Sequence, residues 1–529
     1  MSAPSTPKNF PANWSSPDLP PDQFLYGRKG PWPQPSPTHP LKEAAEVLNV
    51  PLVETLVWDA TVGLRLLKGQ AAFPALAAYD AMFDGMSLIP SDDEFNAMML
   101  NTAYTRYMKP KLDADKRHLD KAPNAAKFWQ YDFSAMKLVE PLAGMYCAPV
   151  VCVFAQDGSG RRSCLYIRFR GETDGEDVFV FPGGGDAWNL AKIYVLQACA
   201  YHMLFVVHPA LHFPMDSVNA ITKTAVPHTH PLFQLLYPHT SYTLALDNAV
   251  LEGPNSVVNS NAQGTWFDPL MGNAYNLKLL FGAGYAGLNT DGQDPWFGDA
   301  YPPYDFMKPQ MGFDSPYGKW LADYFPPFLK FCEAVAHEIL KEHKKDTYVA
   351  RWARYNSTYV RGFPDENSIF KDGCLAQAMA IFMWDVTVSH GGDHYSFGLN
   401  IPAKFKFLRV RNYPPLPDPP PVGGPTKVGD VANGDDLYRA ELAQRMFFGP
   451  HAMAPNLNET YYPFTDFMLQ LAQKSFHDLL TDVSQQYQHQ YSLDMPFMPL
   501  DVTQAPKLPP SPYPAYTEYE LTIPASIQY

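Results

Sequence analysis

Apolar residues recur at helical spacing along three long segments of the chain. Residues 186–212, 318–343 and 374–390 carry them at positions i, i+3, i+4 and i+7. This period places apolar side chains on one face of an α-helix. The segments are also longer than ordinary strands, which seldom exceed about ten residues. We therefore expect three long helices that bury their apolar faces in the core.

Strand-like patterns are fewer and lie close together. They are residues 148–155, 163–170 and 177–182. Each is a short run rich in β-branched and aromatic residues, which favour strands. GSG at 158–160 predicts a hairpin turn, and FPGGGDAW at 181–188 predicts a turn that starts a helix, with Asp186 as its cap. The pattern predicts a mainly α-helical protein with a small β-sheet at residues 145–182.

Proline-rich stretches mark the breaks in this pattern. Residues 1–42 are rich in Pro and Ser and show no period, which is typical of an arm on the surface. Repeated prolines at 413–430 exclude a regular helix, but helical patterning resumes directly afterwards. That stretch is therefore interpreted as a long loop. We expect an N-terminal arm over residues 1–42 and one large domain over residues 43–529.

Composition and charge narrow the class of protein. Of the 529 residues, 46% are hydrophobic and 18% charged, and the net charge is −14. An acidic chain is a poor partner for nucleic acid or an anionic membrane, both of which reward clustered Lys and Arg. We expect no stretch that approaches the ~20 apolar residues needed to span a bilayer, and therefore no transmembrane segment. The N-terminus lacks the basic start and apolar run of a secretory signal, so we expect a cytoplasmic protein.

The cysteines and histidines point to different chemistry. No two of the six cysteines stand at C-x-x-C spacing, so zinc ribbons and iron–sulfur clusters have no support. His208/His212 and His390/His394 are each four residues apart, which places both imidazoles of a pair on one side of a helix. Two such helices side by side could offer four nitrogens to iron, manganese, zinc or copper. Hydrogen-bonded core histidines are the alternative, and spacing alone leaves the two interpretations open.

Four segments, in order along the chain, resemble the lipoxygenase family. They are DAWNLAK at 186–192, THPLFQLLYPH at 229–239, LAQAMAIFMWDVTVSHGGDHYSFG at 375–398 and the terminal IPASIQY at 523–529. The first resembles the family's entry into its first ligand helix, the second its H-P-x-x-x signature, the third its second ligand helix and the fourth its C-terminus. The resemblance implies a single large helical catalytic domain over residues 43–529, without the family's N-terminal β-barrel.

The resemblance also implies a metal site and a reaction. Its protein ligands would be His208, His212, His390, His394 and the carboxylate of Tyr529. They would hold one non-haem iron ion or, as the alternative, manganese. The implied reaction adds O2 to a polyunsaturated fatty acid of the linoleate or arachidonate type. A hydrogen atom leaves a bis-allylic methylene, oxygen adds to the radical, and a hydroperoxide is released. The protein is expected to act as a monomer.

Other histidines of the region are assigned by the same resemblance. His230 and His239 belong to the signature and would be structural, hydrogen-bonded between helices. His202 and His228 are interpreted as non-ligands.

The sequence departs from the family's pattern in several places. Most members space the first two ligands five residues apart in a π-turn, whereas here they are four apart, as in the branch of fungal manganese lipoxygenases. Pro209 lacks the N–H that would bond the carbonyl of Phe205, so we expect a distorted helix there. Met203 and Phe397 replace glutamines usual beside the ligands, and Val250 falls where product stereochemistry correlates. These three are the candidates for the substrate channel.

The departures leave two alternatives to a fatty-acid lipoxygenase. One is an oxygenase of the same fold that acts on a different lipid or a metabolite. The other is a lipid-binding homologue that has lost turnover.

Overall fold

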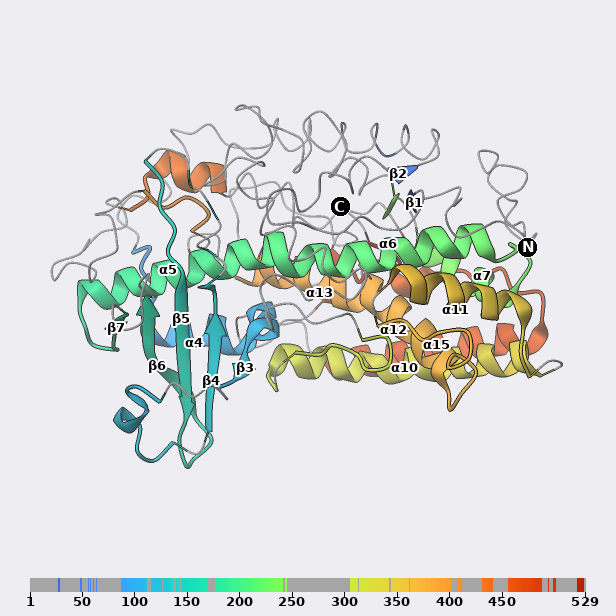
Figure 1. Ribbon diagram of the computed structural model, residues 1–529, viewed down its shortest axis with the longest axis horizontal. Coiled ribbons are helices and arrows are strands. Elements are labelled where there is room, and N and C mark those ends of the chain that lie inside the picture. Colours follow the sequence, from blue (N-terminus) through green and yellow to red (C-terminus); the bar gives the residue numbers. More distant parts are fainter. Residues whose placement is uncertain are drawn as a thin grey trace.

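The structure is a computed structural model, in which helices dominate and a five-stranded sheet lies at one end (Figure 1). A second sheet pairs the two short antiparallel strands β1 (Gly27–Arg28) and β2 (Leu48–Asn49). Short gaps and a few isolated residues aside, it describes residues 27–28, 48–49, 87–240, 305–411, 431–440, 455–487, 498–500 and 521–527. The mainly α-helical class with a small sheet is confirmed. The predicted arm over residues 1–42 and the proline-rich loop at 413–430 lie almost wholly outside the described residues.

One helix runs without interruption from Asp186 to Ala225 and crosses most of the view in Figure 1. It consists of α5 (Asp186–His202), the π-helical segment η5 (Met203–Val207) and α6 (His208–Ala225). We call it the first histidine helix. The prediction for residues 186–212 is confirmed, and the helix continues further.

The start of this helix corrects one prediction. Gly185 is the N-cap, with φ 62°, and Asp186 occupies the first helical position. The predicted Asp186 cap is wrong because the chain enters the helix through a backbone conformation that glycine adopts freely. Asp186 instead places a negative charge in the first turn, where the helix dipole favours it.

The same helix answers the question of a membrane span. Among the described residues, Asp186–Val207 is long and apolar enough to cross a bilayer, with a mean hydropathy of 1.5. The expectation that no stretch approaches this composition was wrong. However, 89% of the most apolar stretch of this helix is buried inside the protein. A helix that is apolar all round and enclosed by protein is a core helix.

A second continuous helix carries the other histidine pair. We call it the second histidine helix. It consists of α12 (Cys374–Trp384), η8 (Asp385–Ser389), α13 (His390–Tyr395) and η9 (Ser396–Asn400). η8 and η9 are π-helical. The helix predicted over 374–390 is confirmed, although its two π-helical segments were not foreseen.

Three further helices, α10 (Pro316–Leu340), α11 (Thr347–Tyr359) and α15 (Phe467–Ser484), pack against the histidine helices or against one another. α10 packs along α12 on one side and along α15 on the other, and α11 packs on α6 (Figure 1). The helix predicted over 318–343 is confirmed as α10, which starts two residues earlier because Ser315 caps it and Pro316 occupies the first helical position. Each histidine helix therefore packs against at least one of these helices.

The sheet has five antiparallel strands in sequential order. They are β3 (Lys109–Pro110), β4 (Lys127–Asp132), β5 (Val150–Gln156), β6 (Arg162–Phe169) and β7 (Val178–Val180). The three strands and the hairpin predicted from the sequence are confirmed, whereas β3 and β4 were missed. β5 reads as an unbroken apolar run because both of its faces are covered. Val150 and Cys152 face the main core, while Val151 and Val153 belong to a smaller cluster.

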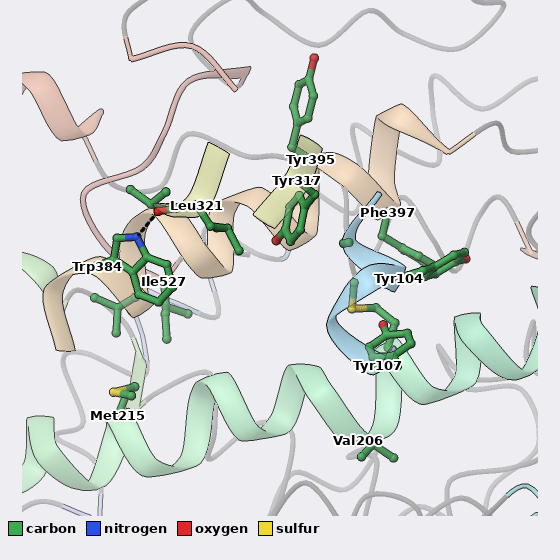
Figure 2. Packing of buried hydrophobic residues seen from close by; sticks show 14 of the residues in the cluster. Tyr104, Tyr107, Val206, Met215, Tyr317, Leu321, Trp384, Tyr395, Phe397 and Ile527 are labelled. Atoms are coloured by element: carbon green, nitrogen blue, oxygen red, sulfur yellow. Dashed lines mark hydrogen bonds between the residues drawn. The ribbon is translucent and has the colours of Figure 1, made fainter. Parts of the chain in front are cut away.

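A short 3₁₀ helix connects the sheet region to the histidine helices. α4 (Asp92–Asn101) begins with a capping box of Ser91 and Glu94 and leads into η2 (Ala103–Tyr107). Tyr104 of η2 contacts the ring of Phe397, and Tyr107 contacts the ring of His202. Figure 2 shows these two tyrosines between the second histidine helix and the first. η2 thus lies between the two helices.

Candidate metal centre

The two histidine helices bring both predicted pairs to one place. His208 is the first residue of α6, directly after η5, and His390 is the first residue of α13, directly after η8. His212 and His394 follow four residues later on the same helix sides. All four side chains are buried.

The four imidazoles converge through their ring nitrogens. The Nε2 atom of His212 lies 2.9 Å from that of His208 and 2.9 Å from that of His390. Ring centroids of His208 and His394 are 4.8 Å apart, and those of His390 and His394 are 4.5 Å apart. Potential ligand nitrogens of His208, His390 and His394 lie within 4.8 Å of one another. The predicted histidines therefore form one cluster.

These distances test whether a metal ion fits. A neutral Nε2 carries either one hydrogen or one lone pair, so an N–H···N bond cannot explain both 2.9 Å approaches to His212. With metal–nitrogen distances of about 2.0–2.1 Å, nitrogens at right angles lie about 2.9 Å apart, and tetrahedral ones lie about 3.4 Å apart. The observed spacing fits adjacent corners of a six-coordinate ion, which accepts nitrogen and oxygen ligands.

Burial keeps the histidines neutral. Desolvation lowers the pKa of His212 to about 3. It also holds the pKa values of His208 and His390 well below the ordinary value, and the neighbouring histidines lower them further. Since metal binding requires the unprotonated imidazole, these three rings can present nitrogen lone pairs at neutral pH.

Two glycines in HGGDH let other elements approach the second pair. A Cβ on Gly391 would lie 3.0 Å from Cδ of Pro524 and 3.3 Å from Sδ of Met498. A Cβ on Gly392 would overlap the ring of Trp320 on α10. The C-terminal segment and α10 can therefore pack directly on the turn between His390 and His394.

The C-terminal segment 521–527 is threaded into the core beside this turn. Ile523 donates its N–H to Pro499 O at 2.8 Å, and the Ser526 hydroxyl donates to His239 O at 2.9 Å. Figure 2 shows Ile527 among the same buried side chains as Trp384. Tyr529 lies outside the described residues, so its carboxylate remains a prediction.

A buried charged network beside the cluster was missed by the sequence interpretation. Arg106 Nε lies 2.8 Å from Asp393 Oδ1, and the Tyr317 hydroxyl donates to the same carboxylate oxygen. Burial raises the pKa of Asp393 to about 6, while Arg106 opposes that rise. Burial alone would lower the pKa of Arg106, but Asp393 and Tyr317 raise it overall. The one signal in the sequence was an acidic residue between two histidines of an apolar helix.

The other histidines lie apart from the cluster. His239 is buried, with Nδ1 2.5 Å from Ala525 O and Nε2 2.8 Å from the Tyr462 hydroxyl. Its predicted hydrogen bonding is confirmed, but the partners lie in non-helical segments and not in neighbouring helices. His230 caps α7 (Pro231–Leu236) by accepting from the N–H of Leu232. The two histidines interpreted as non-ligands, His202 and His228, also lie apart from the cluster. His202 packs edge-on to Tyr107 and Phe133, and His228 is exposed.

The three residues predicted to line a substrate channel have different outcomes. Met203 is buried at the start of η5, one residue after His202. Phe397 is buried in η9, with its ring centroid 6.3 Å from that of Tyr104. Val250 lies outside the described residues. Their role toward a substrate remains a prediction. The helix distortion expected at Pro209 is confirmed by η5, where His208 N–H bonds to Met203 O.

Comparisons with known proteins find similarity to lipoxygenases. No family model matches the chain. The polyunsaturated fatty acid lipoxygenase ALOX15B of Rattus norvegicus is 33% identical over 125 residues, which are 22% of this chain and 18% of that protein. The chain thus matches less than a fifth of the length of such curated relatives.

Solved structures resemble the chain over most of its length. Manganese lipoxygenase of Gaeumannomyces graminis has a TM-score of 0.61 at 14% identity, covering 90% of this chain and 91% of that one. A crystal structure of a lipoxygenase in complex with arachidonate has a TM-score of 0.57 at 16% identity, with 82% and 71% covered. Identities this low show a shared fold.

Proposed function

Because the chain belongs to the lipoxygenase family, we propose that it is a metal-dependent dioxygenase of polyunsaturated fatty acids. The observation that carries the proposal is that the Nε2 atoms of His208 and His390 each lie 2.9 Å from His212 Nε2. His394 completes the set from the same buried cluster. The carboxylate of Tyr529 is proposed as the fifth protein ligand.

The residues of the chain supply binding and a dry environment. Neutral imidazoles donate lone pairs at physiological pH because burial lowers their pKa values. The ion, when bound, would supply the one-electron redox chemistry that removes a hydrogen atom from a bis-allylic methylene. Met203 and Phe397, both buried on the two histidine helices, are proposed to exclude water and to suit an acyl chain.

Iron and manganese are both proposed, because nitrogen and carboxylate ligands without thiolates suit either. Manganese gains support from the Gaeumannomyces graminis enzyme, which is a manganese lipoxygenase and covers nearly the whole chain. The four-residue spacing of His208 and His212 favours the same branch. Iron is the ion of the wider family that the sequence resembles.

The proposed substrate is a free fatty acid of the linoleate or arachidonate type. Support comes from the structural relative in complex with arachidonate and from the curated relatives, which are named as polyunsaturated fatty acid lipoxygenases. Replacement of the usual glutamines by Met203 and Phe397 is the observation that favours a second candidate, an oxygenase of a different lipid.

The test is oxygen uptake together with conjugated-diene absorbance. Protein loaded with Fe²⁺ or Mn²⁺ is mixed with linoleate or arachidonate. We expect both signals to rise with at least one metal, and to fall to background in His390→Ala. The control is His202→Phe, which replaces a buried histidine outside the cluster with a ring of similar size. If protein that holds metal takes up no oxygen with linoleate and none with arachidonate, the fatty-acid proposal is contradicted and the second candidate is favoured.

A further inference from the structure

η2 contacts the second histidine helix at three positions that bracket the two histidines. Arg106 Nη2 donates to Ser389 Oγ at 2.7 Å, Arg106 Nε lies 2.8 Å from Asp393 Oδ1, and Ala103 N–H donates to Ser396 Oγ at 2.9 Å. The three partners are spaced i, i+4 and i+7, which places them on one face of the helix.

His390 and His394 each follow one of these contact points by one residue. One residue turns a helix by about 100°, so the histidine pair lies beside the contacted face. A rotation of the helix would move the Nε2 atoms and the three contacts together. The contacts with η2 therefore fix the direction in which this turn presents its two imidazoles.

Arg106 is committed to these contacts. Its side chain is 6% exposed and Asp393 is fully buried. The guanidinium also lies 5.5 Å from the ring centroid of Tyr317, whose hydroxyl donates to Asp393. Its second bond to Ser389 goes to the backbone oxygen at 3.3 Å. A buried arginine engaged by a carboxylate, a hydroxyl and a carbonyl is poorly placed to take a substrate carboxylate.

A buried ion pair is an expensive way to gain stability. Moving two charges out of water costs free energy that their attraction offsets only with good geometry and further hydrogen bonds. Buried polar contacts often serve to orient metal-binding histidines. The position of this pair, one residue before His394 and next to Ser389, fits that use.

We propose that Arg106 is a positioning residue for the metal centre. Through Ser389 and Asp393 it fixes the rotation of the turn that carries His390 and His394, and Ala103 N–H secures the far side of that turn at Ser396. The inference rests on the proposed metal site. It concerns how tightly and in what geometry the ion is held.

The test compares Mn²⁺ binding among variants of the full-length protein. Dissociation constants come from competition with a chelator, and the electron paramagnetic resonance line shape of bound Mn²⁺ reports its geometry. We expect Arg106→Met to weaken Mn²⁺ binding about 10- to 100-fold, as is typical when such supporting contacts are lost, and to change the line shape. Arg106→Lys keeps the charge but not the forked hydrogen bonds, so we expect a smaller loss.

Two further variants keep the test decisive. Ser396→Ala removes the acceptor for Ala103 N–H while leaving every charge paired, and we expect it to weaken binding severalfold even if Arg106→Met does not fold. The matched control is Arg168→Met, which breaks a similarly buried pair with Asp177 on the sheet. β6 lies toward one end of the molecule, whereas α13 lies near its middle (Figure 1). We expect the control to lower the melting temperature and to leave the affinity and line shape unchanged.

The outcomes separate the inference from the proposed function. Wild-type protein that binds Mn²⁺, with the same affinity and line shape in the folded Arg106 and Ser396 variants, overturns the positioning role alone. Wild-type protein that binds neither Mn²⁺ nor Fe²⁺ overturns the metal site, and the inference with it. Mn²⁺ binding that is weakened equally in Arg168→Met would also overturn the positioning role, because the loss of affinity would then follow from a general loss of stability.

Discussion

His208 and His390 occupy equivalent positions in two different helices. Each is the first α-helical residue after a five-residue π-helical segment, and each is followed by a second histidine four residues later. The surroundings differ. The first histidine helix enters the cluster from an apolar segment, Met203–Val207. The second carries Asp393, which forms a buried ion pair with Arg106, between its two histidines. Two glycines, Gly391 and Gly392, also lie between these histidines.

The difference shows two ways of placing an imidazole. A π-turn shifts the following side chains around the helix and occurs often at functional sites. Both helices contain one before their first histidine, and in the first helix Pro209 also lacks an N–H. The second helix adds specific contacts from η2 (Ala103–Tyr107), α10 (Pro316–Leu340) and the C-terminal segment. We infer that the second pair depends more strongly on its neighbours.

The largest effect that separates the helices is expected at Gly392. Gly392→Ala would place a methyl group too close to the edge of the Trp320 ring, so α10 or the histidine turn must move. Overpacking of this kind costs typically about 1–3 kcal/mol. We expect urea unfolding to show a loss of stability in that range, and smaller for Gly391→Ala.

The control for this change is Gly158→Ala in the exposed hairpin, where nothing lies within 4 Å of the added carbon. It should alter stability by less than about 0.5 kcal/mol, as surface changes usually do. Equal stability of Gly392→Ala and wild type would show that the second helix is no more constrained than the first.

A second effect, which builds up over a range of pH, concerns acid stability and the first helix. Burial lowers the pKa of His202 to about 3, compared with about 6.5 in the unfolded chain. Because the folded-state pKa is depressed, the unfolded chain binds the proton first. Stability is complete above pH 6.5 and falls as the pH drops toward 3. This one group contributes about 1.4 kcal/mol of loss per pH unit in that window.

His202→Phe tests this sign directly. The variant keeps an aromatic ring against Tyr107 and Phe133 and removes one titrating group. In metal-free protein, its free energy of unfolding should fall less steeply between pH 6 and pH 4 than that of the wild type. Parallel curves would mean that His202 is not buried as a neutral ring.

Much of this arrangement was predictable from periodicity. The helices over 186–212, 318–343 and 374–390 follow from apolar spacing, because burial of one face leaves a repeat that the sequence records. Two pairs of histidines at i, i+4 in such helices predicted the cluster, although spacing alone left core histidines as an equal alternative. The resemblance to lipoxygenases then selected between them.

Other features depend on contacts that no local pattern reveals. Arg106 meets Ser389 across 283 residues of chain, and nothing in the sequence around either residue indicates the pairing. The π-helical segments of the second histidine helix have no compositional signature. β4 was missed because only two of its residues, Trp129 and Tyr131, are buried. Gly185 replaced Asp186 as the cap because the entry to the helix needed a positive φ.

The most direct test of the metal centre is the number of metal ions bound per chain, with one variant in each helix. Protein purified after growth with added iron and manganese is analysed by elemental mass spectrometry as wild type, His208→Ala and His390→Ala. We predict close to one ion per chain in the wild type and almost none in either variant, because both helices supply ligands. A full equivalent of metal retained in both variants, or no metal in the wild type, would contradict a shared centre between the two histidine helices.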